Sequence, residues 1–330
     1  MNGLRRIFAK ADRFTTGIII SVILGLVLPC NGGYAEAFDT LTNAAIVLLF
    51  YLYGVKLSRE SVIAGLLNWR LQSMVLLFTF VFFPIVIPLL QPVFEPLVGA
   101  SLYAGMIYVA CLPSTVQSSI AFTSVAGGNV PAAVCSASVS SLLGVFLTPM
   151  LVGLLFSHSG ASSTDIGADT ILKICYQILL PFVLGQLSRK WLKNWVNSHK
   201  QLISLNDQTT IWLVIYTSFS GATVSGYWSQ LSPLQLAALI LVSGVILSLT
   251  FLATYCSSKA LRFSREDRIA IVFCGSKKSL AVGAPMMMAI FGEHDNNLLL
   301  PLMVFHQVQL MACAQLARIW HRKGADTGGY

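Results

Sequence analysis

The sequence contains few charged residues: only 10% of its 330 residues are Asp, Glu, Lys or Arg, whereas 55% are hydrophobic. A soluble domain carries about 25% charged residues, so this composition excludes a soluble globular protein and indicates one that crosses a membrane several times. The seven cysteines show no metal-binding spacing and, being odd in number, no closed disulfide framework. We therefore expect no metal centre and no cofactor.

Motifs of the common enzyme classes are also missing. The sequence has no Cys/His cluster, no phosphate-binding glycine loop and no G-x-S-x-G nucleophile elbow. No Asp or Glu lies deep inside an apolar segment, so a buried acid or base is missing as well. A membrane-embedded enzyme is therefore the weakest functional alternative.

Apolar segments long enough to span a membrane occur ten times in the chain. A helix needs about 20 mostly apolar residues to cross a hydrocarbon core roughly 30 Å thick. The basic N-terminus and the apolar run after it could form a cleaved signal peptide, but we expect an uncleaved first helix, because cleavage would leave an odd number of spans. The sequence predicts one all-α, polytopic membrane domain over residues 1–330, with spans at 14–29, 38–55, 71–90, 99–126, 130–156, 169–188, 208–226, 233–255, 269–291 and 297–319.

The basic residues predict the orientation of these spans. Eighteen of the 21 Lys and Arg residues fall at the two ends of the chain and in alternate connections, whereas the opposite connections are mainly acidic. Because cytoplasmic loops are enriched in Lys and Arg, we expect a cell inner membrane protein with both termini in the cytoplasm. The net charge of +8 is then a topology signal, and we expect a lipid bilayer rather than nucleic acid as partner.

Ten spans divide into two halves of five with opposite orientation, which is typical of transporters built from inverted repeats. The expected repeats are 14–156 and 169–319. Ser118–Ala121 in span 4 aligns with Lys278–Ala281 in span 9, and each follows a cysteine and a helix breaker, Pro113 or Gly275. We therefore expect spans 4 and 9 to be broken helices.

Two adjacent lysines, Lys277 and Lys278, lie inside span 9. A charge near a bilayer centre costs roughly 2.5–3.5 kcal/mol on insertion scales, so such residues usually face a cavity and mark function. Polar residues elsewhere in spans 4, 5, 9 and 10 complete the candidate substrate or ion site. The candidates are Ser114, Thr115, Gln117, Ser118, Ser119, Ser136, Ser138, Ser276, Lys277, Lys278, Ser279, His306, Gln307 and Gln309.

Motifs around the two predicted breaks are similar to those of one transporter family. They are Leu112-Pro113, Gly127-Gly128-Asn129, Leu147-Thr148-Pro149 and the segment from Cys274 to Ala281. With them the chain resembles the bile acid:sodium symporter superfamily in its SBF-like branch, which includes the seventh member of human solute carrier family 10 and bacterial relatives. The resemblance implies core helices at 71–156 and 233–319, panel helices at 14–55 and 169–226, and a substrate site between them.

The resemblance also implies that the sodium site is altered. The better-known symporters bind two sodium ions with hydroxyls and an amide from spans 4 and 5 and with a Glu and a Gln from span 9. Here Ser118 and Ser119 match the span-4 ligands, and Lys277 stands at the Gln position. The other matched positions carry Ala133, Ala137 and Phe273. The resemblance thus implies a vestigial sodium site near Ser118, Ser119, Phe273 and Lys277.

Three interpretations of the lysines are open. An ammonium group could replace sodium by bridging spans 4 and 9 through Ser118, Ser119 or freed carbonyls. It could instead pair with an anionic substrate. Because Lys277 lies roughly 13 Å beyond Arg268 along a helix, both side chains could also snorkel to the interface. Two successive helical residues point about 100° apart, so we expect different roles, with Lys277 nearer the altered ion site.

These features predict a secondary active transporter that moves a small organic anion by alternating access. Its coupling would be sodium-independent or proton-linked. The alternatives are a sodium-coupled organic anion symporter with a rearranged site, and a membrane regulator of ion homeostasis without flux of its own.

Overall fold

The computed structural model describes residues 13–56, 68–159, 175–291 and 298–327. Within these ranges the chain is helical apart from short turns and breaks, and it contains no strand. Six of the described helices are apolar and long enough to cross a membrane, and two shorter apolar helices lie at Thr16–Val27 and Ala100–Cys111. The all-α prediction is therefore confirmed, whereas the ten spans and their inverted repeat stay predictions.

The chain divides into two compact units, of which the first comprises residues 1–56, 170–231 and 284–299. Its helices pack in close pairs. Gly54 and Gly185 allow α3 and α12 to approach, because an added Cβ on either glycine would overlap a backbone carbonyl of the other helix. The elements of this unit are α2 (Arg13–Val27), α3 (Gly33–Lys56), η2 (Cys175–Leu179), α12 (Leu180–Ser198), α13 (Lys200–Val224) and α14 (Tyr227–Gln230).

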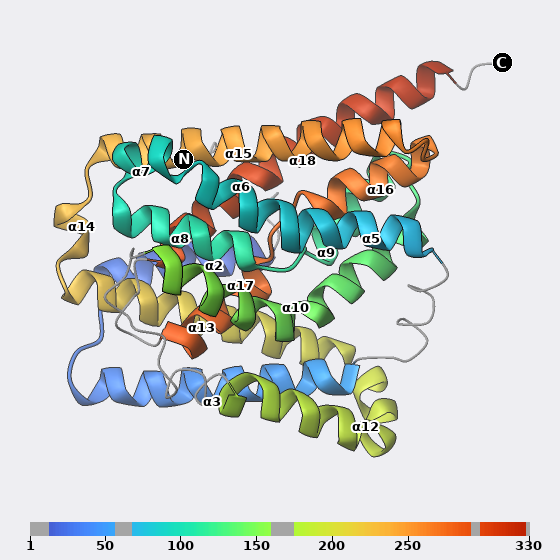
Figure 1. Cartoon of the computed structure of the whole chain (residues 1–330). Coiled ribbons are helices and arrows are strands. Elements are labelled where there is room, and N and C mark those ends of the chain that lie inside the picture. The colour runs from blue at the N-terminus through green and yellow to red at the C-terminus, as the bar shows by residue number, and fades with distance from the viewer. Residues whose placement is uncertain (1–12, 57–67, 160–174, 292–297, 328–330) are drawn as a thin grey trace, which may run out of the picture. The chain divides into compact units, whose positions relative to one another are not determined.

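The second unit comprises residues 57–169, 232–283 and 300–330. Its first long helix, at Trp69–Leu89, consists of α5 (Trp69–Leu77), the π-helical turn η1 (Phe78–Phe82) and α6 (Phe83–Leu89). Helix α17 begins in this unit and continues into residues of the first one. The other elements are α7 (Gln91–Val98), α8 (Ala100–Cys111), α9 (Gln117–Val125), α10 (Val130–Ser159), α15 (Pro233–Ala260), α16 (Arg265–Gly275), α17 (Leu280–Phe291) and α18 (Leu299–Thr327), as Figure 1 shows.

Several helices run beyond the predicted spans. Helix α12 continues to Ser198 and α13 begins at Lys200, although the apolar segments end at 188 and begin at 208. Hydropathy detects the apolar part of a helix, whereas hydrogen bonding continues the helix through polar residues such as Arg189 and Lys190. The start of the predicted span 169–188 lies partly outside the described residues.

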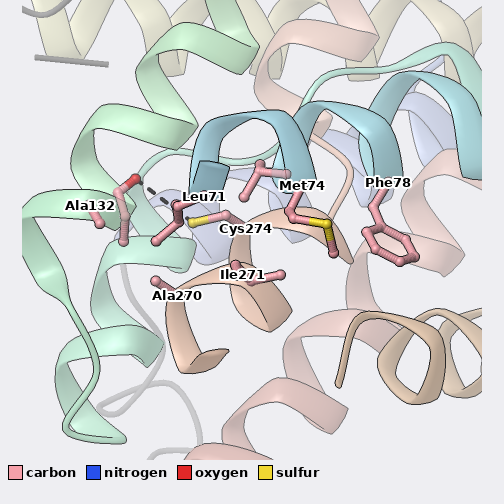
Figure 2. Close-up of a cluster of buried hydrophobic side chains, with 9 residues drawn as sticks. Leu71, Met74, Phe78, Ala132, Ala270, Ile271 and Cys274 are labelled. Atoms are coloured by element: carbon pink, nitrogen blue, oxygen red, sulfur yellow. Dashed lines mark hydrogen bonds between the residues drawn. The ribbon is translucent and has the colours of Figure 1, made fainter. Parts of the chain in front are cut away.

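A buried hydrophobic cluster holds α16 against α5 and α10. Leu71, Met74 and Phe78 project from the first long helix toward Ile271 and Cys274 of α16, as Figure 2 shows. All five side chains are at most 9% exposed. The cluster thus fixes the C-terminal end of α16, where the first buried polar groups follow.

The predicted turn at residues 127–129 also ties α9 and α10 to α16. Gly127 has φ +70°, which a residue with a Cβ rarely adopts. The Asn129 backbone N–H donates to the Glu266 carbonyl at 3.0 Å, and the Asn129 amide donates to the Asp267 carboxylate at 2.7 Å. The turn therefore fixes the start of α16, as the cluster fixes its end.

Candidate functional site

The candidate site is built on two helices that stop in the interior of the second unit. Helix α8 ends at Cys111, the chain is extended at Leu112, and α9 begins at Gln117. Likewise α16 ends at Gly275, and α17 begins at Leu280. The breaks lie where the sequence predicts them. Pro113 explains the first, because proline lacks an N–H and cannot continue the hydrogen bonds of a helix.

Direct hydrogen bonds join the two breaks. The Ser114 hydroxyl donates to the Cys274 carbonyl at 2.5 Å, and the Ser119 hydroxyl donates to the Phe273 carbonyl at 3.1 Å. In the opposite direction, the Ser279 backbone N–H donates to the Pro113 carbonyl at 2.9 Å. Each broken helix therefore satisfies backbone groups that the other leaves unpaired, as a buried backbone requires.

Five consecutive carbonyls at the end of α8 and in the break, those of residues 110–114, have hydrogen-bond donors. Thr148 of α10 donates from its hydroxyl to the Cys111 carbonyl at 2.8 Å. The neighbouring carbonyls accept from side chains or backbone of other segments. The carbonyls and their donors are Ala110 and Leu112 with Lys278, Pro113 with Ser279, and Ser114 with Ser141. Hydrogen bonds to other segments thus hold the break in place.

Thr148→Val is expected to lower the melting temperature of the purified protein. The substitution keeps the side-chain shape but leaves the buried Cys111 carbonyl without its donor, which costs roughly 1–3 kcal/mol. Ser138→Ala on the same helix is the matched control, because Ser138 only donates to Val134 of its own helix. Equal melting temperatures for the two variants would contradict the role given to Thr148.

Lys278 lies at the second break and is fully buried. Its ammonium group donates to the carbonyls of Thr79 and Ala110, both at 2.7 Å, and to that of Leu112 at 2.8 Å. The nitrogen also lies 4.3 Å from the centroid of the Phe83 ring. An ammonium has three N–H donors, so this lysine is fully satisfied.

Lys277 is equally buried but has much poorer partners. Its ammonium lies 3.3 Å from the Ser118 hydroxyl, which is a long hydrogen bond. The other neighbours are aromatic, with ring centroids of Phe122 at 4.2 Å and Phe273 at 5.7 Å. Among the residues that the structure describes, no carboxylate lies within ion-pairing distance of this ammonium.

The two lysines therefore differ in their hydrogen-bond partners. The sequence also predicts a difference between them, but on the basis of helical periodicity. Both lie in the non-helical break, so helical periodicity does not set their directions. Lys277 is the one next to Ser118, where the altered ion site is expected. Neither side chain is exposed at all, so the snorkelling interpretation is wrong for this structure.

Gln309 of α18 binds the backbone of Lys278 from both sides. Its amide oxygen accepts from the Lys278 N–H at 2.9 Å, and its amide nitrogen donates to the Lys278 carbonyl at 2.8 Å. The same nitrogen lies 2.9 Å from Nδ1 of His306. Because the amide orientation is fixed by Lys278, Nδ1 of His306 acts as acceptor, and its proton belongs on Nε2.

The remaining candidates fall into two groups. Thr115 joins the site, with its hydroxyl 2.8 Å from that of Ser118 and 3.0 Å from that of Ser119. The Ser276 hydroxyl donates to the Val272 carbonyl of α16, and the Ser279 hydroxyl accepts from the Val282 N–H in the first turn of α17. The others do not contact these residues through hydrogen bonds. Gln117 and Gln307 are exposed, Ser138 pairs within its own helix, and Ser136 is buried without a hydrogen-bond partner.

The chain is similar to known membrane transporters over almost its whole length. The model of the SBF-like CPA transporter family matches residues 12–322. The chain belongs to this family. The resemblance that the motifs indicate is thereby confirmed, and the protein is a member of a family of transporters rather than enzymes.

Curated relatives of this SBF-like protein include bacterial and vertebrate chains. It is 49% identical over 316 residues to an uncharacterised protein of Pseudomonas aeruginosa, covering 96% of this chain and 94% of that one. It is 48% identical over 320 residues to Escherichia coli YfeH, which is provisionally named a symporter, covering 96% and 95%. It is 30% identical over 312 residues to sodium/bile acid cotransporter 7-B of Xenopus laevis, covering 92% and 89%.

Three of the positions that are expected to hold sodium ligands in relatives are apolar in this SBF-like protein. Phe273, Ala133 and Ala137 are all fully buried. The Phe273 ring packs 6.0 Å from the Phe122 ring and 5.4 Å from the Trp320 ring, measured between centroids. These side chains offer no oxygen to a hard cation, so the hydroxyls of Thr115, Ser118 and Ser119 are the side-chain oxygens that remain near Lys277.

Sequence reasoning missed the partners that hold this SBF-like site together. Thr79, Phe83 and Thr148 are not among the candidates, although they contact Lys278 or the break after α8. One signal was present, namely Pro84 inside span 3, since a proline within a helix leaves a carbonyl without its usual donor.

Proposed function

We propose that the protein is a secondary active transporter that moves a small organic anion by alternating access and does not need sodium. The observation that carries the proposal is the Lys277 ammonium, which is buried beside the two helix breaks with one long hydrogen bond and, among the described residues, no carboxylate within ion-pairing distance. An unpaired buried charge is costly, so such a group is retained where a partner arrives during function. An anionic solute would be that partner.

Three features support a site near α9. Ser118, which contacts Lys277, is half-buried, and Gln117 beside it is exposed. Phe122, one turn further along α9, is also only partly buried and lies under the ammonium. A solute that contacts this side of α9 would meet a cation, hydroxyls and an aromatic ring, which together suit a carboxylate attached to an apolar body.

Electrostatics argue against a sodium ion beside Lys277. Two positive charges 4 Å apart repel by about 4 kcal/mol at an effective dielectric constant of 20. The apolar Phe273, Ala133 and Ala137 provide no compensating oxygens. We therefore propose that the ammonium takes over the charge that sodium provides in the better-known symporters, and that coupling is sodium-independent or proton-linked.

A sodium-coupled symporter is the second candidate, because the Xenopus laevis relatives are named sodium/bile acid cotransporters. Thr115, Ser118 and Ser119 form a hydroxyl cluster that could ligate a cation if Lys277 moved away. In this candidate the sodium ion binds where the Lys277 ammonium now lies, and the ammonium moves away. Transport that requires sodium is therefore the property that distinguishes this candidate.

Thermal stability provides the first test. Purified protein is heated with a panel of mono- and dicarboxylates, in sodium chloride and in potassium chloride, since a ligand stabilises by RT ln(1 + [L]/Kd). We expect one or more carboxylates to raise the melting temperature equally in both salts, and proteoliposomes to accumulate the same compounds. Stabilisation only in sodium would favour the second candidate, and binding without flux would favour a regulator.

A further inference from the structure

The surroundings of Lys278 have the composition of a binding site for a small cation. Three backbone carbonyl oxygens, from Thr79, Ala110 and Leu112, converge on one point at 2.7–2.8 Å from its nitrogen. The Phe83 ring, itself fully buried, covers the same point at 4.3 Å. Carbonyl rings of this kind coordinate monovalent cations in channels, and aromatic faces attract ammonium ions. We call these four groups the carbonyl cage.

A proline accounts for the first carbonyl of the cage. In the π-helical turn η1 each N–H bonds five residues back, and the Phe83 N–H donates to the Phe78 carbonyl. The next donor in this register would be residue 84, which is a proline and has no N–H. The Thr79 carbonyl is therefore left without a donor from its own helix, and Lys278 provides one.

A second proline accounts for the other two carbonyls. Ala110 would pair with residue 113 or 114 if α8 continued, but Pro113 has no N–H, and the Ser114 N–H donates to Ser140 at 3.0 Å. Leu112 is extended, with φ −78° and ψ 152°, so its carbonyl points out of the helical pattern. None of the three oxygens therefore has a donor within its own helix, and all three are available to accept from Lys278.

We propose that the Lys278 ammonium is a built-in monovalent cation, which fills a carbonyl cage that would bind a free primary ammonium ion if the lysine were removed. The cage joins η1 and the end of α8 to the start of α17. The cation inside the cage therefore fixes the positions of the broken helices relative to one another. The inference is independent of what the protein transports. It assigns Lys278 a permanent positioning role and leaves Lys277 as the lysine with free donors.

Chemical rescue tests the proposal. In Lys278→Ala the lost atoms correspond to n-propylammonium, so this ion is added to the purified variant while its melting temperature is measured. We expect the variant to melt lower than the natural protein by on the order of 10 °C, because several buried carbonyls lose their donors. Propylammonium should restore a large part of this shift with a saturable dose dependence. Propanol, which is neutral, and tetramethylammonium, which has no N–H, should not.

Lys277→Ala is the matched control, because Lys277 is also fully buried but has only the Ser118 hydroxyl as a polar partner. Equal rescue of both variants, no rescue of Lys278→Ala, or an unchanged melting temperature in Lys278→Ala would each overturn the proposal. If Lys278→Ala does not fold, Lys278→Met is compared with Lys277→Met. The cage then predicts a loss of folded protein or of melting temperature for Lys278→Met alone, and equal stability of the two methionine variants would overturn it.

Discussion

Lys277→Gln is expected to weaken binding and uptake of the anionic solute by about 30-fold or more. Removing one partner from a buried, hydrogen-bonded charge pair costs roughly 2–5 kcal/mol, which corresponds to at least that factor in affinity. Glutamine keeps a donor near Ser118 but removes the positive charge. The effect is measured as the dissociation constant of the carboxylate found by thermal shift and as its initial rate of uptake into proteoliposomes.

The same substitution is expected to leave the melting temperature unchanged or to raise it. Without solute, the Lys277 ammonium is buried with one long hydrogen bond, so replacing it by a neutral amide relieves a desolvation penalty. Loss of function without loss of stability distinguishes a solute-binding lysine from a structural one. Unchanged affinity and uptake in Lys277→Gln would contradict the role proposed for this residue.

Gln309→Leu is expected to be strongly destabilising. The substitution removes the acceptor for the Lys278 N–H and the donor for the Lys278 carbonyl, and both groups are buried. Each unsatisfied buried group costs roughly 1–3 kcal/mol, so we expect a loss of about 2–6 kcal/mol. In a melting experiment this loss appears as a decrease on the order of 10 °C.

Gln307→Leu is the matched control for this prediction. Gln307 lies on the same helix, but it is exposed, whereas Gln309 is fully buried. We expect the control to change the melting temperature little, because it removes no described hydrogen bond. Equal shifts in the two leucine variants would show that Gln309 does not hold the second break.

The helix breaks could be predicted because their causes are local. Pro113 lacks the N–H that would continue α8, and Gly275 weakens the helix just before the polar residues 276–279. The turn at 127–129 follows in the same way from Gly127, which has a positive φ. Such features depend on a few neighbouring residues, so one sequence is enough to place them.

Ser118 could be predicted as a partner of Lys277, but the carbonyls that pair with Lys278 could not be identified, because they come from distant parts of the chain. The Lys278 ammonium pairs with carbonyls 166 to 199 residues away. No spacing in the sequence connects Pro84, which frees the Thr79 carbonyl, with a lysine in the break between α16 and α17. For Lys278 the sequence therefore indicates freed carbonyls as partners without indicating which ones.

The roles of Gln307 and Gln309 could be predicted from the sequence only in part. Residues two apart on a helix point about 200° from each other, so the sequence indicates that both amides cannot face the same cavity. Only the packing of α18 shows that Gln309 faces the second break and Gln307 does not. Periodicity thus separates the two candidates, and tertiary contacts decide between them.

Sodium dependence of uptake tests the central proposal most directly. Proteoliposomes that contain the natural protein are given the carboxylate found by thermal shift, in sodium chloride or in choline chloride, with Lys277→Gln in both salts as control. The account predicts the same initial rate of uptake in the two salts and a strongly reduced rate for the variant in both. Uptake that occurs only with an inward sodium gradient would contradict it.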